Sequence, residues 1–83
     1  MREPDNALVN AIRVLLAKRG AGKTICPSEA ARVAYPQDWR HHLEATRQAA
    51  LALRDRGEID ICQGGKPVKR NCFSGPIRLR KTN

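Results

Sequence analysis

The segment that decides the fold is GEIDICQGGKPVKRNCFSGPIRLRK, residues 57–81. Residues 58–63 alternate polar and apolar side chains, and the alternation returns at residues 77–80 after Gly75 and Pro76. A period of two is typical of a strand with one buried face. Glycine and proline between the two runs are typical of turns. The segment predicts a β-hairpin with strands at about 58–63 and 76–81 and a long loop at about 64–75.

Upstream of the hairpin the apolar residues recur at helical spacing. A first helix is predicted at about 6–19, because Asp5 and Asn6 are favourable N-cap residues and Gly20 is a favourable stop. Residues 24–26 follow this helix and form a short segment that begins with two β-branched residues. We expect them to add a third strand beside the hairpin.

Two more helices are predicted between this short strand and the hairpin. The helix at about 27–34 begins at Pro27, which suits the first helical position, and ends before Pro36. The helix at about 38–56 has an apolar stripe that starts at Trp39, and we expect a kink near its beginning. In so small a core we expect Trp39 to be a core residue rather than a contact residue.

The hairpin needs the helices, because a two-stranded hairpin alone is marginal in water. The element order is helix, short strand, helix, longer helix, strand, loop, strand. This order predicts a mainly helical α+β fold, a winged helix-turn-helix with three helices and a C-terminal β-hairpin. With 83 residues the chain is long enough for one domain, which we place at residues 1–83.

The charge balance is strongly basic. Sixteen lysines and arginines against eight aspartates and glutamates give a formal net charge of +8. Such a chain is attracted to polyanions, which include nucleic acid, anionic membranes and acidic proteins. The alternative is a small basic domain that binds none of them.

The cysteines and the N-terminus indicate a reduced, cytoplasmic protein. Cys26, Cys62 and Cys72 are odd in number and widely spaced, unlike a disulfide framework. Residues 1–5 lead into an amphipathic stretch rather than an apolar leader, and no apolar run approaches about 18 residues. We expect no membrane partner. Cys26 and Cys62 are interpreted as small buried hydrophobes, whereas Cys72, near Arg70, has an alternative interpretation as a reactive thiol.

No motif predicts catalysis or metal binding. His41 and His42 are adjacent, so on a helix they point about 100° apart and do not chelate one ion. No recognisable motif places a histidine or an acid beside Ser28 or Ser74. We therefore expect no enzymatic activity, no catalytic residue, no metal and no cofactor.

Three stretches resemble a known family: TICPSEAARVAYPQDWR at 24–40, ATRQAALALRDRGEIDICQGGKPV at 45–68 and GPIRLRK at 75–81. They are similar to an uncharacterised bacterial winged-helix family whose members share ICPSE, DW, QxGxPV and GPIRLR segments. The resemblance covers most of residues 20–81. It implies a winged-helix fold and a bacterial source, and it implies no activity, so no functional residue is transferred.

The helix at 38–56 is the candidate for sequence reading, because in helix-turn-helix proteins the second helix of the pair enters the major groove. Arginine pairs with guanine and glutamine with adenine. The candidate residues on its exposed face are Arg40, His41, Arg47 and Gln48. Asp38 and Glu44 on the same face would repel phosphate and count against this prediction.

The basic wing, residues 64–81, is the candidate for phosphate contact. Positive side chains there would give affinity without sequence information. Arg78 and Arg80 alternate with Ile77 and Leu79, so we expect both arginines to point away from the core. The candidate residues are Lys66, Lys69, Arg70, Arg78 and Arg80. In the alternative interpretation they form only a solvated hairpin face that resists aggregation.

Together these features predict a DNA-binding winged helix that acts as a small regulator or accessory protein. The alternative is a protein docking module whose wing meets an acidic partner without nucleic acid. RNA is a third candidate in duplex or structured form, because aromatic platforms for stacking single-stranded bases are nearly absent. The target sequence, any effector and the oligomeric state are not predicted.

Overall fold

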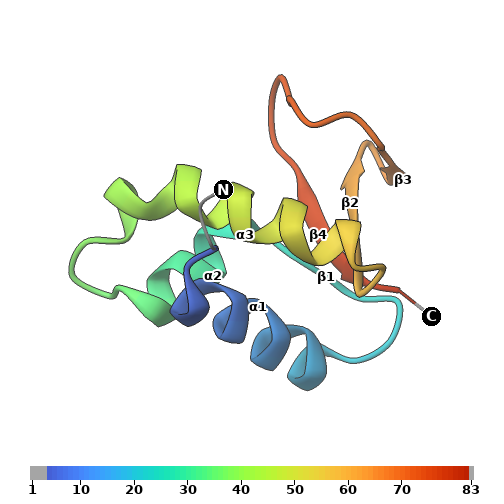
Figure 1. Ribbon diagram of the computed structural model, residues 1–83. Helices are drawn as coiled ribbons and strands as arrows, with labels where there is room; N and C mark the ends of the chain where they lie inside the picture. The colour runs from blue at the N-terminus through green and yellow to red at the C-terminus, as the bar shows by residue number, and fades with distance from the viewer. Residues whose placement is uncertain (1–3, 83) are drawn as a thin grey trace.

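The computed structural model describes residues 4–82, and within them three α-helices accompany one four-stranded antiparallel sheet (Figure 1). The elements are α1 (Asn6–Arg19), β1 (Thr24–Ile25), α2 (Pro27–Ala34), the 3-10 turn η1 (Trp39–His42), α3 (Leu43–Asp55), β2 (Ile59–Gln63), β3 (Lys66–Pro67) and β4 (Arg78–Lys81). The predicted α+β class with mainly helical content is confirmed. The arrangement is compatible with a winged-helix-like fold.

The sheet has the strand order β1-β4-β2-β3, so the last strand of the chain is inserted between the first two. Leu79 of β4 pairs with Ile25 on one side and Ile61 on the other. All three side chains are fully buried against the helices. The short strand expected at 24–26 is therefore present at Thr24–Ile25, and it joins the sheet through β4.

The first two helices form where their caps are satisfied. The Asp5 carboxylate accepts hydrogen bonds from the backbone N–H groups of Ala7, at 2.8 Å, and Leu8, at 3.2 Å, at the start of α1. At α2 the Glu29 carboxylate accepts the backbone N–H of Cys26 at 2.7 Å. Their observed bounds are those predicted.

The third helix differs from the prediction at its start. Residues 39–42 form a 3-10 turn, and the α-helix begins only at Leu43. His42 lies at φ −110° and ψ 11°, outside the helical region. Its imidazole stacks on Tyr35 with ring centroids 3.6 Å apart. This contact with the end of α2 accompanies the break in the helix, and the kink expected near its start is this turn.

The hairpin also differs from the single long loop that was predicted. The chain turns at Gly64 and Gly65, which have φ values of 58° and 81°, and returns at once as β3. Two central residues with positive φ are the requirement of a type I′ hairpin turn. Lys66, expected in a loop, is therefore paired with Gln63 of β2. The remaining connection, residues 68–77, is called the wing loop below.

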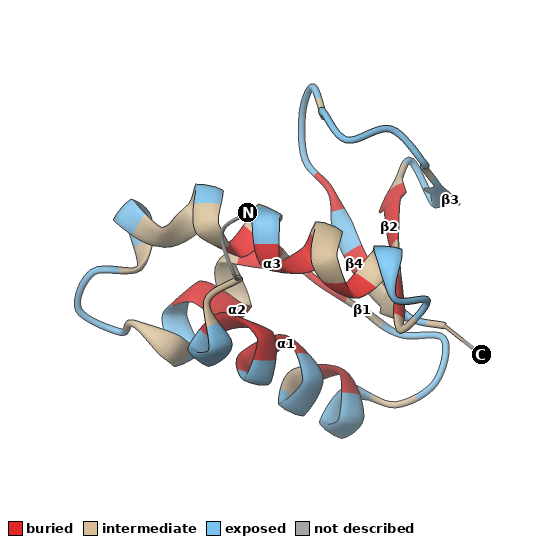
Figure 2. Cartoon of the chain, in the orientation of Figure 1, coloured by how far each residue is buried: buried red, intermediate tan, exposed pale blue. Residues whose placement is uncertain are grey.

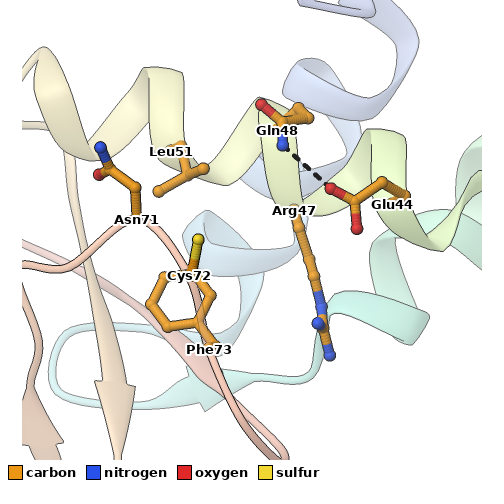
Figure 3. Close-up of a pocket in the computed structure, with 7 residues that line it drawn as sticks. All are labelled: Glu44, Arg47, Gln48, Leu51, Asn71, Cys72 and Phe73. Carbon is orange, nitrogen blue, oxygen red and sulfur yellow. Dashed lines mark hydrogen bonds between the residues drawn. The ribbon is translucent and has the colours of Figure 1, made fainter.

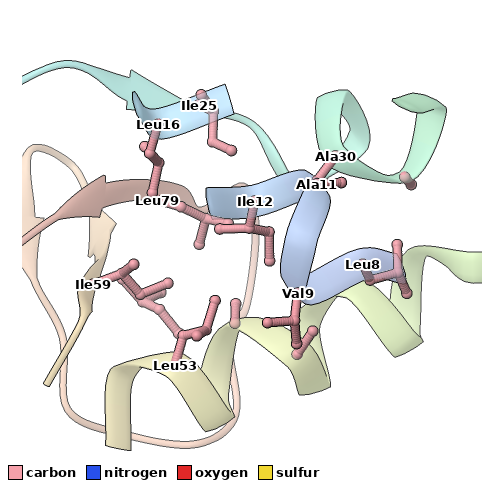
Figure 4. Close-up of a cluster of buried hydrophobic side chains, with 14 of the residues drawn as sticks. Leu8, Val9, Ala11, Ile12, Leu16, Ile25, Ala30, Leu53, Ile59 and Leu79 are labelled. Atoms are coloured by element: carbon pink, nitrogen blue, oxygen red, sulfur yellow. The ribbon is translucent and has the colours of Figure 1, made fainter. Parts of the chain in front are cut away.

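The core lies between the helices and the inner face of the sheet (Figures 2 and 4). Leu8 and Ile12 of α1, Leu53 of α3 and Leu79 of β4 are all fully buried there. Thr46 is buried among them, and its hydroxyl donates a hydrogen bond to the carbonyl of His42 at 2.7 Å. Within residues 4–82 no helix is long and apolar enough to cross a lipid bilayer.

Candidate nucleic-acid interface

The wing loop lies alongside α3, and a shallow groove of about 240 Å³ separates them (Figure 3). The α3 wall is formed by Glu44, Arg47, Gln48 and Leu51, and the loop wall by Asn71, Cys72 and Phe73. Phe73 is partly buried and packs against the core. The exposed side of α3 and the wing loop therefore form one surface rather than two separate ones.

The wing loop is fixed by long-range side-chain hydrogen bonds. Arg54 of α3, only 13% of whose side chain is exposed, donates to the carbonyl of Arg70 at 2.7 Å and to the Asn71 side chain. Gln63 at the end of β2 donates to the carbonyl of Ser74 at 2.8 Å and accepts from the Arg70 guanidinium at 2.7 Å. Arg54 and Gln63 thus hold both limbs of the loop.

The four candidate residues near α3 have different surroundings. Arg40 is exposed on η1, and its guanidinium lies over the Trp39 ring. His41 is exposed and bonds Asp38. Gln48 donates to Glu44 at 3.0 Å, whereas the half-buried Arg47 extends along the groove in Figure 3. Only Arg47 and Gln48 line the groove itself.

Asp38 and Glu44, which count against phosphate binding, are both engaged locally. His41 hydrogen-bonds the Asp38 carboxylate, and His42 approaches it at 3.3 Å. The hydrogen bond from His41 lowers the pKa of Asp38. Glu44 accepts the amide of Gln48. The two negative charges remain on this side of the molecule, but each has a nearby donor.

The wing candidates divide into two groups. Lys66, Lys69 and Arg70 are exposed on β3 and the wing loop. Arg78 and Arg80 are on the central strand β4, on the face opposite Leu79. The five residues that the sequence grouped as one basic wing therefore lie on different elements.

Arg78 and Arg80 also have partners within the sheet. Arg78 donates to the Thr24 hydroxyl at 3.0 Å. Arg80 pairs with Asp60 across the strands at 2.9 Å, and this hydrogen bond raises the pKa of Arg80. Both arginines point away from the core, as predicted, but Arg80 is half-buried and its charge is balanced by Asp60.

The remaining reactive side chains are dispersed. Cys26, Cys62 and Cys72 are free thiols that are half-buried, buried and exposed, respectively. Cys62 is in β2, whereas Cys72 lines the groove, so the latter is the accessible thiol. In residues 4–82 no three histidine, cysteine or acidic side chains gather in a way that would hold a metal ion. Trp39 is only half-buried, less than was expected of a core residue.

These elements define a small, basic, mainly helical α+β protein whose arrangement is compatible with a winged helix. Residues 5–82 match the model of a protein family of unknown function, DUF3253, and the chain belongs to that family. Comparison with curated protein sequences found no match. The resemblance to a small uncharacterised family is therefore confirmed.

Sequence reasoning missed Arg54 and Gln63, which position the wing loop. In the sequence Arg54 is a polar residue off the apolar stripe of its helix, and Gln63 is the last residue of a predicted strand. Arg54 bonds a loop carbonyl 16 residues further along the chain, and Gln63 bonds one 11 residues further along. No local sequence signal indicates such a hydrogen bond for an arginine or a glutamine. The QxGxPV segment of the resembled family does include Gln63, and it was the one available hint.

Proposed function

We propose that this protein binds double-stranded DNA as a winged helix, with α3 toward the major groove and the wing loop against the phosphate backbone. The observation that supports this most directly is the adjacency of the two elements. The exposed side of α3 and the wing loop border one groove, and arginine lies on both: Arg47 on α3 and Arg70 on the loop. This placement fits a protein that reads base edges and holds phosphates from the same side.

The charge on this surface supports the same proposal. Within residues 4–82 none of Arg40, Arg47, Lys69 and Arg70 pairs with a carboxylate, and Arg70 bonds only the neutral amide of Gln63. An unpaired cation keeps its full charge for a ligand, whereas a paired one must first be released. The excess positive charge of the chain is therefore available next to α3.

The proposal assigns different roles to the basic residues. Arg47 would contact a base edge, since it is the arginine of α3 that lines the groove. Lys69 and Arg70 would contact phosphate without sequence preference. Arg78 and Arg80 would be mainly structural, because they bond Thr24 and Asp60 inside the sheet.

A binding role is preferred to a catalytic one. Both histidines are engaged with Asp38, and the Ser28 hydroxyl donates to the Cys26 sulfur at 3.3 Å. None of these contacts places a serine or a cysteine beside a histidine, which is the arrangement that nucleophilic catalysis requires. We therefore propose no reaction for this protein.

The division of roles can be tested with two variants and a randomised duplex library. Lys69→Ala/Arg70→Ala should weaken binding to all duplexes by a similar factor, because the variant removes phosphate contacts and the Arg70–Gln63 hydrogen bond, neither of which reads sequence. Arg47→Ala should change which sequences are selected, with an effect of about 1–3 kcal/mol at one position. Arg80→Ala removes one positive charge, as Arg47→Ala does, and is the control for that variant; it should change affinity and sequence selection less than Arg47→Ala. Equal selection profiles for the wild type and Arg47→Ala would contradict the role of α3.

A further inference from the structure

A second basic site lies beside the start of α3, where η1 meets α2. Trp39 is the only tryptophan in the chain, and it is half-buried at the first position of η1. The guanidinium carbon of Arg32, from α2, lies 4.2 Å from the centroid of the indole ring. That of Arg40 lies 4.7 Å from the ring centroid. These three residues are called the Arg–Trp cluster.

The two positive charges of the Arg–Trp cluster are not balanced by an acid. Arg32 and Arg40 are both exposed, and neither pairs with a carboxylate in the part of the chain from Pro4 to Thr82. The acid next to the cluster in sequence, Asp38, is directed to His41 and His42 instead. Two like charges close to one ring repel each other, so a bound anion would stabilise this arrangement.

The cluster also offers the kind of donor that binds an oxyanion. A guanidinium that stacks on an aromatic ring keeps the N–H groups at its edge free, and those groups match phosphate oxygens. Stacking holds the long arginine side chain in place, so less conformational entropy is lost when the ligand binds. The Trp39 ring is already contacted by guanidinium groups, which disfavours stacking of an unpaired base on it.

The position of the cluster relates it to the proposed DNA surface. Residues 39–42 directly precede α3, whereas the wing loop lies beside residues 44–54. Glu44, in the first turn of α3, lines the groove together with the wing loop, so residues 39–42 lie just beyond the groove along the chain. In Figure 1 the chain enters α3 on the left, and the wing loop lies at the upper right. A duplex that lies along α3 and meets the wing loop would therefore reach the cluster beside the start of the helix.

We propose that Arg32, Trp39 and Arg40 form a second phosphate-binding site for the backbone of duplex DNA. This inference rests on the proposed function and extends that interface from α3 onto α2. Arg32 and Arg40 contact phosphate, and Trp39 is a positioning residue that acts through them. Arg40 then provides affinity rather than sequence preference.

The test uses a labelled random-sequence duplex and two simultaneous readouts. Anisotropy of the label reports binding, and the intrinsic fluorescence of Trp39 reports the cluster alone, since no other tryptophan is present. We expect the Trp39 signal to change along the same binding curve as the anisotropy. A single-stranded oligonucleotide of the same length is the second arm and should perturb Trp39 less.

Variants separate phosphate contact from a structural role. Arg32→Ala/Arg40→Ala should lower affinity about tenfold or more and reduce the slope of log affinity against log salt by about 2, because each lost phosphate contact removes about 1. Lys18→Ala/Lys23→Ala removes the same charge from exposed residues in and after the last turn of α1 and should have a smaller effect. Trp39→Leu should resemble the arginine variant, and Trp39→Phe should restore most of the binding, since phenylalanine still stacks with guanidinium. Circular dichroism of each variant checks that the fold is retained.

The outcomes distinguish this inference from the proposed function. Binding with an unchanged Trp39 signal, together with a normal salt slope in the double arginine variant, would overturn the inference and leave the proposed function standing. An equal loss in the lysine control would show a general charge effect and would also overturn it. If the wild type binds no duplex at any salt concentration, the proposed function fails and the inference fails with it.

Discussion

Asp5 connects two helices that are far apart in sequence. Its carboxylate caps α1 through the N–H groups of Ala7 and Leu8, and it also accepts the Tyr35 hydroxyl at 2.5 Å. The hydrogen bond from Tyr35 lowers the pKa of Asp5, and the same bond raises the pKa of Tyr35. One side chain thus fixes both the start of α1 and the end of α2.

Replacing Asp5 should therefore destabilise the protein more than a change at its neighbour. We expect Asp5→Ala to lower the free energy of unfolding by about 1–2 kcal/mol, because an N-cap is lost and a hydroxyl loses its acceptor. Denaturant unfolding followed by circular dichroism measures this. Asn6→Ala is the control and should stay within about 0.5 kcal/mol. Equal effects of the two substitutions would contradict the capping role.

Glu29 makes stability depend on pH. The backbone N–H of Cys26, followed by Arg19, lowers the pKa of this carboxyl from its ordinary value of 4.5. A lowered folded-state pKa stabilises the protein above the unfolded value, and this contribution is lost as the pH falls through the folded value. The stability difference between wild type and Glu29→Gln should therefore be large near neutral pH and shrink below about pH 4. A difference that is constant with pH would refute this.

At the residue level, the sequence was informative where the cause is local. The caps of α1 and α2 depend on residues within three positions of the helix start, so Asp5 and Pro27 could be identified. The surroundings of Trp39 depend on Arg32, seven residues away on another helix. Its stripe position predicted a core residue, and in the structure it packs against the core but is only half-buried, with two guanidinium groups over its ring.

At the level of elements, the wing was predicted incompletely. Gly64 and Gly65 between two strand segments are a recognised signal for a two-residue hairpin turn, and that signal could have predicted β3. The fixed conformation of the wing loop could not be predicted from such a local signal. It depends on Arg54 and Gln63, which find their acceptors only after α3 and the sheet have packed.

Loss of Gln63 should release the wing loop while the rest of the fold remains. Gln63→Ala removes the bonds to Ser74 and Arg70, which we expect to lower the free energy of local opening by about 1 kcal/mol or more. Trypsin cleavage after Lys69 and Arg70 should then be roughly fivefold faster. Gln48→Ala is the matched control, because its amide bonds only Glu44 on the same helix. Unchanged cleavage in Gln63→Ala would show that the loop is fixed by other contacts.

At the scale of the whole molecule, β4 joins the parts of the fold. Leu79 lies on the central strand between Ile25 and Ile61 and is fully buried. Because β4 lies between β1 and β2, it pairs with residues 24–25. The wing loop, which leads into β4, lies next to α3. The alternation at 77–80 predicted the strand but not its central place, because pairing with β1 is a long-range contact.

A cavity at this position should be costly for so small a protein. We expect Leu79→Ala to lower the free energy of unfolding by about 2–5 kcal/mol. An 83-residue protein has a total of only roughly 4–12 kcal/mol, so much of the population could unfold. Ile61→Val on the neighbouring strand should cost about 0.5–1.5 kcal/mol. Thermal unfolding of both variants measures this, and a loss below about 1 kcal/mol in Leu79→Ala would contradict a central role for this residue.

The central claim is that the surface of α3 and the wing loop binds duplex DNA through its unpaired cations. The most direct measurement is the affinity of the purified protein for a random-sequence duplex across a series of salt concentrations. If about five phosphates are neutralised, the plot of log affinity against log salt should be linear with a slope of about −4 to −5. An affinity that does not depend on salt, or no binding at low salt, would contradict the account.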